Sequence, residues 1–125
     1  MAQKAFATIT IAQLLEMFEV EQPNNGHRDK GYALVDVLAP ERFEREHIPG
    51  SINIPEGRED EFERRFAKDK EIILYDDSLA CEASTQVARE LARRGFHRVK
   101  DYEEGLQEWK ARKKLVHGTS AQYHE

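Results

Sequence analysis

The sequence predicts a three-layer α/β sandwich, in which a mostly parallel sheet of about five strands is flanked by helices. Two nearly continuous apolar runs, residues 32–38 and 71–75, are typical of strands covered on both faces. Segments with helical periodicity alternate with these runs and with shorter strand-like segments. Because strands that alternate with helices favour parallel pairing through right-handed crossovers, we expect an open sheet between helical layers.

The N-terminal part should contain a short strand, a helix and a loop. Residues 6–9 are a strand-like run, and Thr10 with Gln13 forms a capping box for the helix that follows. The apolar side chains of that helix recur on one face, at Ile11, Leu14, Leu15 and Phe18. The polar stretch 21–30 contains residues that favour turns and is expected to be a loop.

The middle of the chain predicts short elements between the two buried strands. Pro40 suits the first turn of a short helix that runs through residue 45. Residues 51–54 alternate as a short strand. Residues 59–66 form a charged helix that can bury its two phenylalanines, Phe62 and Phe66.

The last third predicts a loop over residues 76–82 and a helix from residue 83 or 84 to 94, which Gly95 ends. A brief strand around Val99 and a helix anchored by Leu106 and Trp109 complete the pattern. We expect one domain over residues 1–115 and a flexible tail over residues 116–125, because 125 residues fit one ordinary domain.

Composition narrows the classes of function. Hydrophobic residues make up 39% and charged residues 34%, with a net charge of −5, which suits a soluble protein. The basic cluster Lys110, Arg112, Lys113 and Lys114 is best interpreted as a solvated helix end, since no aromatic platform for nucleic acid accompanies it. No apolar run is long enough for a membrane span, and the N-terminus does not resemble a signal peptide. A single cysteine favours a reducing, cytoplasmic setting.

The candidate site follows the strand at residues 71–75, because ligands of open α/β sheets bind at the carboxyl ends of the strands. It contains the only cysteine. A thiol before a helix N-terminus can have its pKa lowered, and the backbone N–H groups there can hold an anion. Three neighbouring carboxylates oppose both the lowering of the thiol pKa and the binding of an anion, because like charge disfavours a thiolate. They belong to Asp76, Asp77 and Glu82. The residues of this segment are Asp76, Asp77, Ser78, Leu79, Ala80, Cys81, Glu82, Ala83 and Ser84.

Two interpretations of Cys81 remain open from these residues alone: a reactive thiol, or a small buried apolar side chain. Two supporting residues are Asp36, expected to bond backbone at the end of its strand, and His47. A general base is one interpretation of His47, and a structural hydrogen-bonding residue is the favoured one. No metal site is expected, because one cysteine and scattered histidines lack ligand spacing.

Several phrases, in order, resemble the rhodanese homology domain. They are Val35-Asp36-Val37 followed by Glu41 and Phe43, then residues 47–55, the strand Ile72-Ile73-Leu74-Tyr75, and a closing pattern of Ala88, Leu91, Gly95-Phe96, Val99, Tyr102, Gly105-Leu106 and Trp109. The resemblance covers about residues 8–111. It implies the fold described above and a sulfurtransferase activity without a cofactor.

In that family a loop cysteine takes sulfur from a small anionic donor, becomes a persulfide, and passes the sulfur to a thiol or to cyanide. The usual nucleophile stands directly after the strand's tyrosine, where this chain has Asp76. A carboxylate cannot form a persulfide, so the resemblance leaves Cys81 as the catalytic residue. The loop resembles a variant branch with a cysteine shortly before Ala-Ser.

Two other functions compete with sulfur transfer. One is a catalytically inactive rhodanese-like module that binds a partner protein or a small anion, which the acidic loop favours. The other is a phosphatase or arsenate reductase on the related cell-cycle phosphatase fold. Those reactions need a loop arginine to hold the oxyanion, and residues 76–84 contain none.

Overall fold

The computed structural model describes residues 6–20, 31–112 and 116–119; for residues 19 and 20 it describes the backbone alone. Its five strands form one parallel sheet in the order β1-β5-β4-β2-β3, which confirms the predicted fold class. The strands are β1 Ala7–Thr8, β2 Tyr32–Asp36, β3 Ile52–Asn53, β4 Glu71–Tyr75 and β5 Val99–Tyr102. Tyr75 at the end of β4 pairs with Asp36 on one side and Tyr102 on the other, so three strands end side by side.

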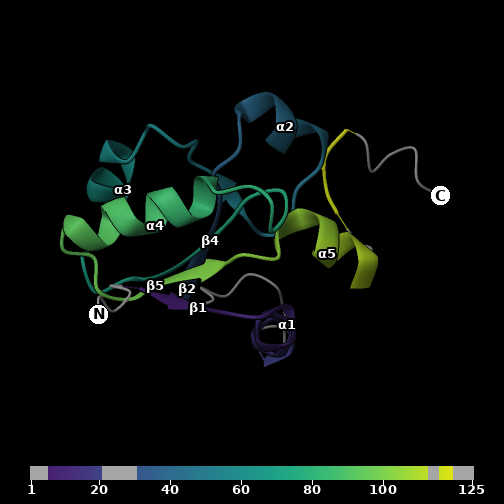
Figure 1. Ribbon diagram of the computed structural model, residues 1–125, viewed down its shortest axis with the longest axis horizontal. Helices are drawn as coiled ribbons and strands as arrows, with labels where there is room; N and C mark the ends of the chain where they lie inside the picture. Colours follow the sequence, from purple (N-terminus) through teal and green to yellow (C-terminus); the bar gives the residue numbers. More distant parts are fainter. Residues whose placement is uncertain (1–5, 21–30, 113–115, 120–125) are drawn as a thin grey trace.

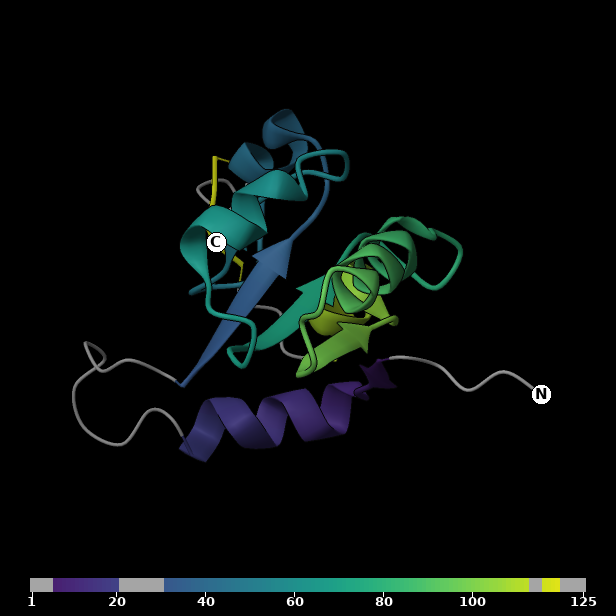
Figure 2. The same cartoon turned by 90° about the vertical axis from the view of Figure 1, so that its left-hand side faces the viewer.

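The helices cover both faces of the sheet. They are α1 Ile11–Val20, α2 Pro40–Arg45, α3 Asp60–Arg65, α4 Ala83–Arg93 and α5 Gly105–Arg112. Helices α3 and α4 lie above the sheet and α1 below it (Figure 1). Figure 2, a view turned by 90°, shows the length of α1 running beneath the strands.

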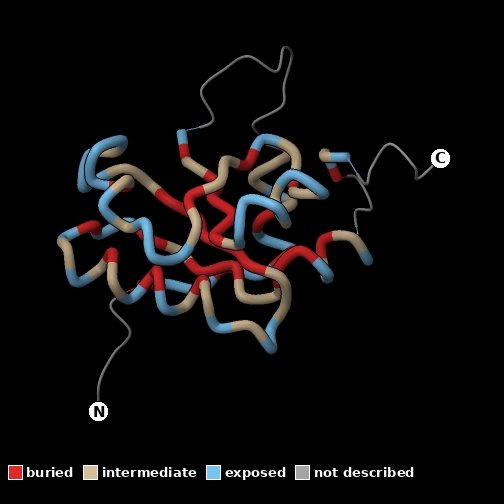
Figure 3. The backbone as a smooth tube through the Cα atoms, turned by 90° about the horizontal axis from the view of Figure 1, so that it is seen from above, coloured by how far each residue is buried: buried red, intermediate tan, exposed pale blue. Residues whose placement is uncertain are grey.

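Two apolar cores result from the alternation of side chains along the central strands. In β4, Ile72 and Leu74 pack with the α3 and α4 side chains Phe62 and Leu91. Ile73 and Tyr75 face the other way, where the cluster includes Leu14 of α1 and Leu106 and Trp109 of α5. Residues 34–37 and 72–76, in and just after β2 and β4, are buried without a break in the middle of the molecule (Figure 3), as the two apolar runs predicted.

Local capping signals explain where helices begin and end. The backbone N–H of Gln13 donates to Thr10 Oγ1 at 3.2 Å, and the N–H of Thr10 donates back to Gln13 Oε1 at 2.9 Å. The predicted capping box is therefore confirmed. Gly95, at φ 100°, follows α4, and the N–H of Phe96 reaches back to the carbonyl of Leu91 at 3.0 Å. The loop expected at residues 21–30 lies outside the described residues.

Part of the expected tail pairs with the domain. His47 and His117 exchange backbone hydrogen bonds of 2.8 and 2.9 Å, and the N–H of Thr119 donates to the carbonyl of Glu44 at 2.9 Å. Val116 is buried in the α1–α5 core. The boundary at residue 116 remains a prediction, and residues 120–125 lie outside the described part of the chain.

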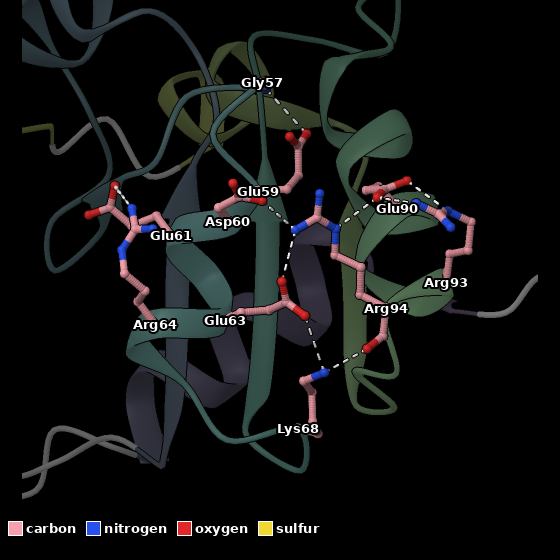
Figure 4. A network of polar contacts seen from close by, with 10 residues as sticks. All are labelled: Gly57, Glu59, Asp60, Glu61, Glu63, Arg64, Lys68, Glu90, Arg93 and Arg94. Carbon is pink, nitrogen blue, oxygen red and sulfur yellow. Dashed lines mark hydrogen bonds and ion pairs between the residues drawn. The ribbon is translucent and has the colours of Figure 1, made fainter.

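An ionic network joins α3 to the end of α4 (Figure 4). The guanidinium of Arg94 contacts Asp60 at 2.8 Å, Glu63 at 2.9 Å and Glu90 at 2.7 Å. Lys68 extends the network to Glu63 at 3.4 Å and donates to the carbonyl of Arg94 at 2.7 Å. One arginine therefore ties the two helices that cover the same face of the sheet.

Candidate active site

The segment between β4 and α4, residues 76–82, lies at the carboxyl edge of the sheet and is held by α5. The N–H groups of Leu106 and Gln107 donate to the carbonyls of Asp76 and Asp77, each at 2.9 Å. These bonds satisfy amides at the start of α5, which would otherwise lack a partner within the helix. The first turn of α5, which is distant in sequence, thus fixes the start of the β4–α4 loop through two backbone hydrogen bonds.

Asp76 is the first residue of this loop, and its side chain is fully buried. Its Oδ2 accepts a hydrogen bond of 2.8 Å from the backbone N–H of Ser84, in the first turn of α4. Its Oδ1 has no hydrogen-bond partner of good geometry among the described residues. Burial raises the pKa of Asp76, and the hydrogen bonds from Ser84 and the Cys81 thiol offset part of the rise. The Asp76 carboxylate therefore accepts a hydrogen bond from an N–H group at the N-terminus of α4, which could otherwise bind an external anion.

Cys81 lies near the end of the loop and is partly exposed. Its backbone N–H donates to the carbonyl of Ser78 at 3.0 Å, which closes a turn. Burial raises the pKa of the Cys81 thiol, and the charge of Asp76 raises it further. Backbone N–H groups of Ala83 and Asp77 act in the opposite direction, because they favour the thiolate. The opposing effects predicted from the sequence are thus both present, and the carboxylate and burial prevail.

The outer rim of the loop carries a cation, Arg42, that no sequence pattern predicted. The guanidinium of Arg42, on α2, contacts Asp77 Oδ1 at 2.7 Å, and Gln107 Nε2 donates to the same oxygen at 2.9 Å. Arg42 is 35 positions from Asp77 in sequence. Its place on a helix that starts just after the carboxyl end of β2 was the available signal. Leu79, at the tip of the loop, is 68% exposed.

The remaining loop residues frame the site. Glu82 is exposed, and its carbonyl accepts the N–H of Gln86 at 3.0 Å. Ala80 is also exposed, whereas Ala83 begins α4 and Ser84 is buried. The hydroxyl of Ser84 donates to Asp101 at 2.6 Å, and that of Thr85 donates to the other oxygen of Asp101 at 2.7 Å. Asp101, at the end of β5, was not identified from the sequence because its role depends on its position beside α4.

Asp36 ends β2, directly beside β4, and its side chain is buried. Its Oδ1 accepts the N–H of Leu38 at 2.8 Å, as expected for a carboxylate that bonds backbone at the end of a strand. Burial raises the pKa of Asp36 to about 6, and the charge of Asp76 adds a smaller rise. Two buried carboxyl groups therefore influence each other at this edge of the sheet.

His47 makes structural contacts. Its Nδ1 lies 2.6 Å from the carbonyl of Phe43, and its ring stacks on the Phe43 ring with centroids 3.8 Å apart. Its backbone pairs with His117. Among residues 6–20, 31–112 and 116–119, no three His, Cys, Asp or Glu side chains form a group that could hold a metal ion. No helix in that same part of the chain is long and apolar enough to cross a membrane.

A family model described as "Rhodanese-like domain" matches residues 19–112. The chain belongs to the rhodanese-like domain family. It is 30% identical over 100 residues to the adenylyltransferase and sulfurtransferase MOCS3 of Drosophila ananassae, covering 75% of this chain and 22% of that protein. It is 30% identical over 83 residues to the thiosulfate sulfurtransferase GlpE of Pseudomonas syringae, covering 66% of this chain and 76% of the relative.

Structural comparison agrees with this assignment. The crystal structure of the BH2092 protein from Bacillus halodurans superposes with a TM-score of 0.77 at 33% identity, covering 91% of this chain and 78% of that one. The rhodanese-like chain spans only 22% of the length of the Drosophila ananassae relative. The resemblance predicted from the ordered phrases is therefore confirmed, and it extends over most of the chain.

Proposed function

We propose that this rhodanese-like protein is a sulfurtransferase that carries sulfane sulfur as a persulfide on Cys81. The observation that carries the proposal is the position of this sulfur: it lies in the β4–α4 loop, partly exposed, with backbone N–H groups of Asp77 and Ala83 favouring its anion. Such N–H groups also stabilise a persulfide anion. Relatives that are named sulfurtransferases support the reaction class.

The reaction consists of two displacements at sulfur. Sγ of Cys81 bonds to the sulfane sulfur of a small anionic donor such as thiosulfate, and the bond from that sulfur to sulfite breaks, so that sulfite leaves with the electron pair. A thiol or cyanide then bonds to the outer sulfur of the persulfide, and Sγ leaves as a thiolate. Each step transfers one sulfur atom without an external oxidant or reductant, and no cofactor is required.

The setting of the reaction follows from the chemistry. A thiol that must cycle between free and persulfidated forms needs a reducing environment, and we place the protein in the cytoplasm on that ground. The acceptor is a small thiol or a partner protein with an accessible thiol. The rim charges Arg42 and Asp77 are paired, so they offer a donor anion little net attraction.

A second candidate is a catalytically inactive binding module. It is favoured by the Asp76 carboxylate, which occupies the Ser84 amide at the start of α4 and raises the pKa of the Cys81 thiol. In this alternative the acidic loop contacts a partner protein and Cys81 has no chemical role. Both candidates use the same edge of the sheet, so a direct assay of turnover separates them.

The test is thiocyanate formation from thiosulfate and cyanide by the wild type, Cys81→Ser and Gln86→Ser. Gln86 is exposed on α4 just beyond the loop and serves as a matched control. The proposal predicts turnover in the wild type and in Gln86→Ser, and none in Cys81→Ser. Full turnover in Cys81→Ser, or none in the wild type with either thiosulfate or a persulfide donor, would exclude the persulfide carrier and favour the binding module.

A further inference from the structure

The carboxyl group of Asp76 and the thiol of Cys81 form a pair within the β4–α4 loop. Asp76 is 0% exposed, and its Oδ1 lacks a partner of good geometry among the described residues. The thiol interacts with this carboxyl group, stabilising its charged form. A buried carboxylate with one free acceptor beside a nucleophilic sulfur has the arrangement of a general base and its proton donor.

We propose that the carboxylate of Asp76 accepts the proton of Cys81 as Sγ bonds to the donor's sulfane sulfur, and returns it when the sulfur is passed on. This inference rests on the proposed sulfur transfer and assigns a role to the residue that replaces the family's usual cysteine. In this scheme Asp76 exchanges a proton with the reacting sulfur, so it acts as a catalytic residue, in addition to holding the N–H of Ser84 through Oδ2.

The proton transfer keeps the charge of the site constant. Before the reaction the pair carries one negative charge, on the carboxylate. When thiosulfate delivers its sulfane sulfur and sulfite leaves, the persulfide holds the negative charge and the carboxyl group holds the proton. The neutral carboxyl group can then donate a hydrogen bond to the persulfide. If Cys81 instead reacted as a thiolate beside an ionised Asp76, two negative charges would share a partly buried site, which is unfavourable.

Other ionisable groups around the pair set the conditions under which it works. Asp101 on β5 and Asp36 on β2 both face Asp76, and each acts against a further negative charge. Asp77 is neutralised by Arg42 from α2, and Glu82 is exposed to solvent. The surroundings of the pair are therefore acidic. They favour passing one negative charge from the Asp76 carboxyl group to the sulfur over ionising both groups at once.

A competing account treats Asp76 as an obstacle that only repels the donor and suppresses the thiolate. The two accounts predict opposite results for Asp76→Asn, in which the side-chain oxygen can still accept the N–H of Ser84. In both accounts the pKa of the Cys81 thiol falls, because a neighbouring charge is removed. The obstacle account predicts faster sulfur loading as a consequence. The proton-transfer account predicts slower loading in spite of the larger thiolate fraction.

The experiment measures single-turnover loading of sulfur from thiosulfate against pH, and titrates the thiol by its ultraviolet absorbance. For the wild type we expect a rate that is flat between the pKa values of Asp76 and Cys81. For Asp76→Asn we expect loading at neutral pH to fall by on the order of 10²-fold and to rise about tenfold per pH unit, following the thiolate. Glu44→Gln, which removes one exposed carboxylate from α2 outside the loop, should keep the flat profile.

The outcomes are distinguishable. Asp76→Asn that loads sulfur faster than the wild type overturns the proton transfer and leaves the proposed function intact. Absence of loading in the wild type overturns both. If Asp76→Asn does not fold, the solvent deuterium isotope effect on wild-type loading decides: a rate that falls in heavy water at the plateau supports a proton in flight, and an unchanged rate contradicts it.

Discussion

Gly105→Ala should strongly destabilise the fold, because Gly105 is where α5 meets the β4–α4 loop. Gly105 has a φ of 76°, and an added Cβ would lie 2.6 Å from the carbonyl carbon of Asp77 and 2.7 Å from the carbonyl oxygen of Asp76. A left-handed backbone costs an L-residue roughly 1–2 kcal/mol, and overpacking adds about 1–3 kcal/mol, so we expect a total of about 2–5 kcal/mol. These backbone atoms cannot move aside without breaking the hydrogen bonds to Leu106 and Gln107.

The matched control is Gly57→Ala. Gly57 also has a positive φ, 98°, but an added Cβ would meet nothing within 4 Å. The free energy of unfolding of this variant should fall only by the cost of the left-handed backbone, roughly 1–2 kcal/mol.

Urea unfolding followed by circular dichroism measures both losses. With an m-value of about 1–3 kcal/mol/M, a further loss of about 2 kcal/mol in Gly105→Ala moves the midpoint by about 0.7–2 M beyond the control. Equal midpoints for the two variants would show that the close approach of α5 and the loop does not contribute, and would refute the reasoning.

Two further predictions concern charge. Burial raises the pKa of Asp36 to about 6, so the folded protein holds the proton of this carboxyl group more tightly than the unfolded chain does. The resulting stabilisation is fully present below about pH 4 and is lost as the pH rises through about 6. At about 1.4 kcal/mol per pKa unit, ionisation of Asp36 lowers the unfolding free energy of the wild type by about 3 kcal/mol. The variant Asp36→Asn should lack this fall. Parallel profiles of urea midpoint against pH for the two proteins would contradict the prediction. Arg94→Ala should lower the urea midpoint, because three carboxylates of α3 and α4 lose their shared partner, and the deficit should shrink in high salt. A midpoint difference that is independent of salt would indicate that the side chain acts through packing.

The fold was predictable because its signals are local and repeated. The apolar runs around Val35 and Ile73 identified the buried strands, and the capping box at Thr10 and the glycine at position 95 identified helix ends. Pro40 stands in the first turn of α2, as its fixed φ predicts. Each of these depends on neighbours within a few positions, which is the range over which sequence patterns are informative.

The site was predictable only in part. The order of strands and helices was enough to locate the loop and Cys81, but the directions of side chains depend on contacts between distant segments. The bonds from Asp76 to Ser84, from Arg42 to Asp77 and from Ser84 to Asp101 span 8, 35 and 17 positions. No local pattern specifies which way a carboxylate in an irregular loop points, so the balance of charges at the thiol required the structure.

The most direct test of sulfur transfer through Cys81 is the intact mass of the protein after incubation with thiosulfate and removal of excess donor. The account predicts that the wild type gains the mass of one sulfur atom, that the added sulfur maps to the peptide containing Cys81, and that cyanide removes it. An unmodified mass after incubation with both thiosulfate and a persulfide donor would contradict the account. Sulfur that remains bound to Cys81→Ser would contradict it as well.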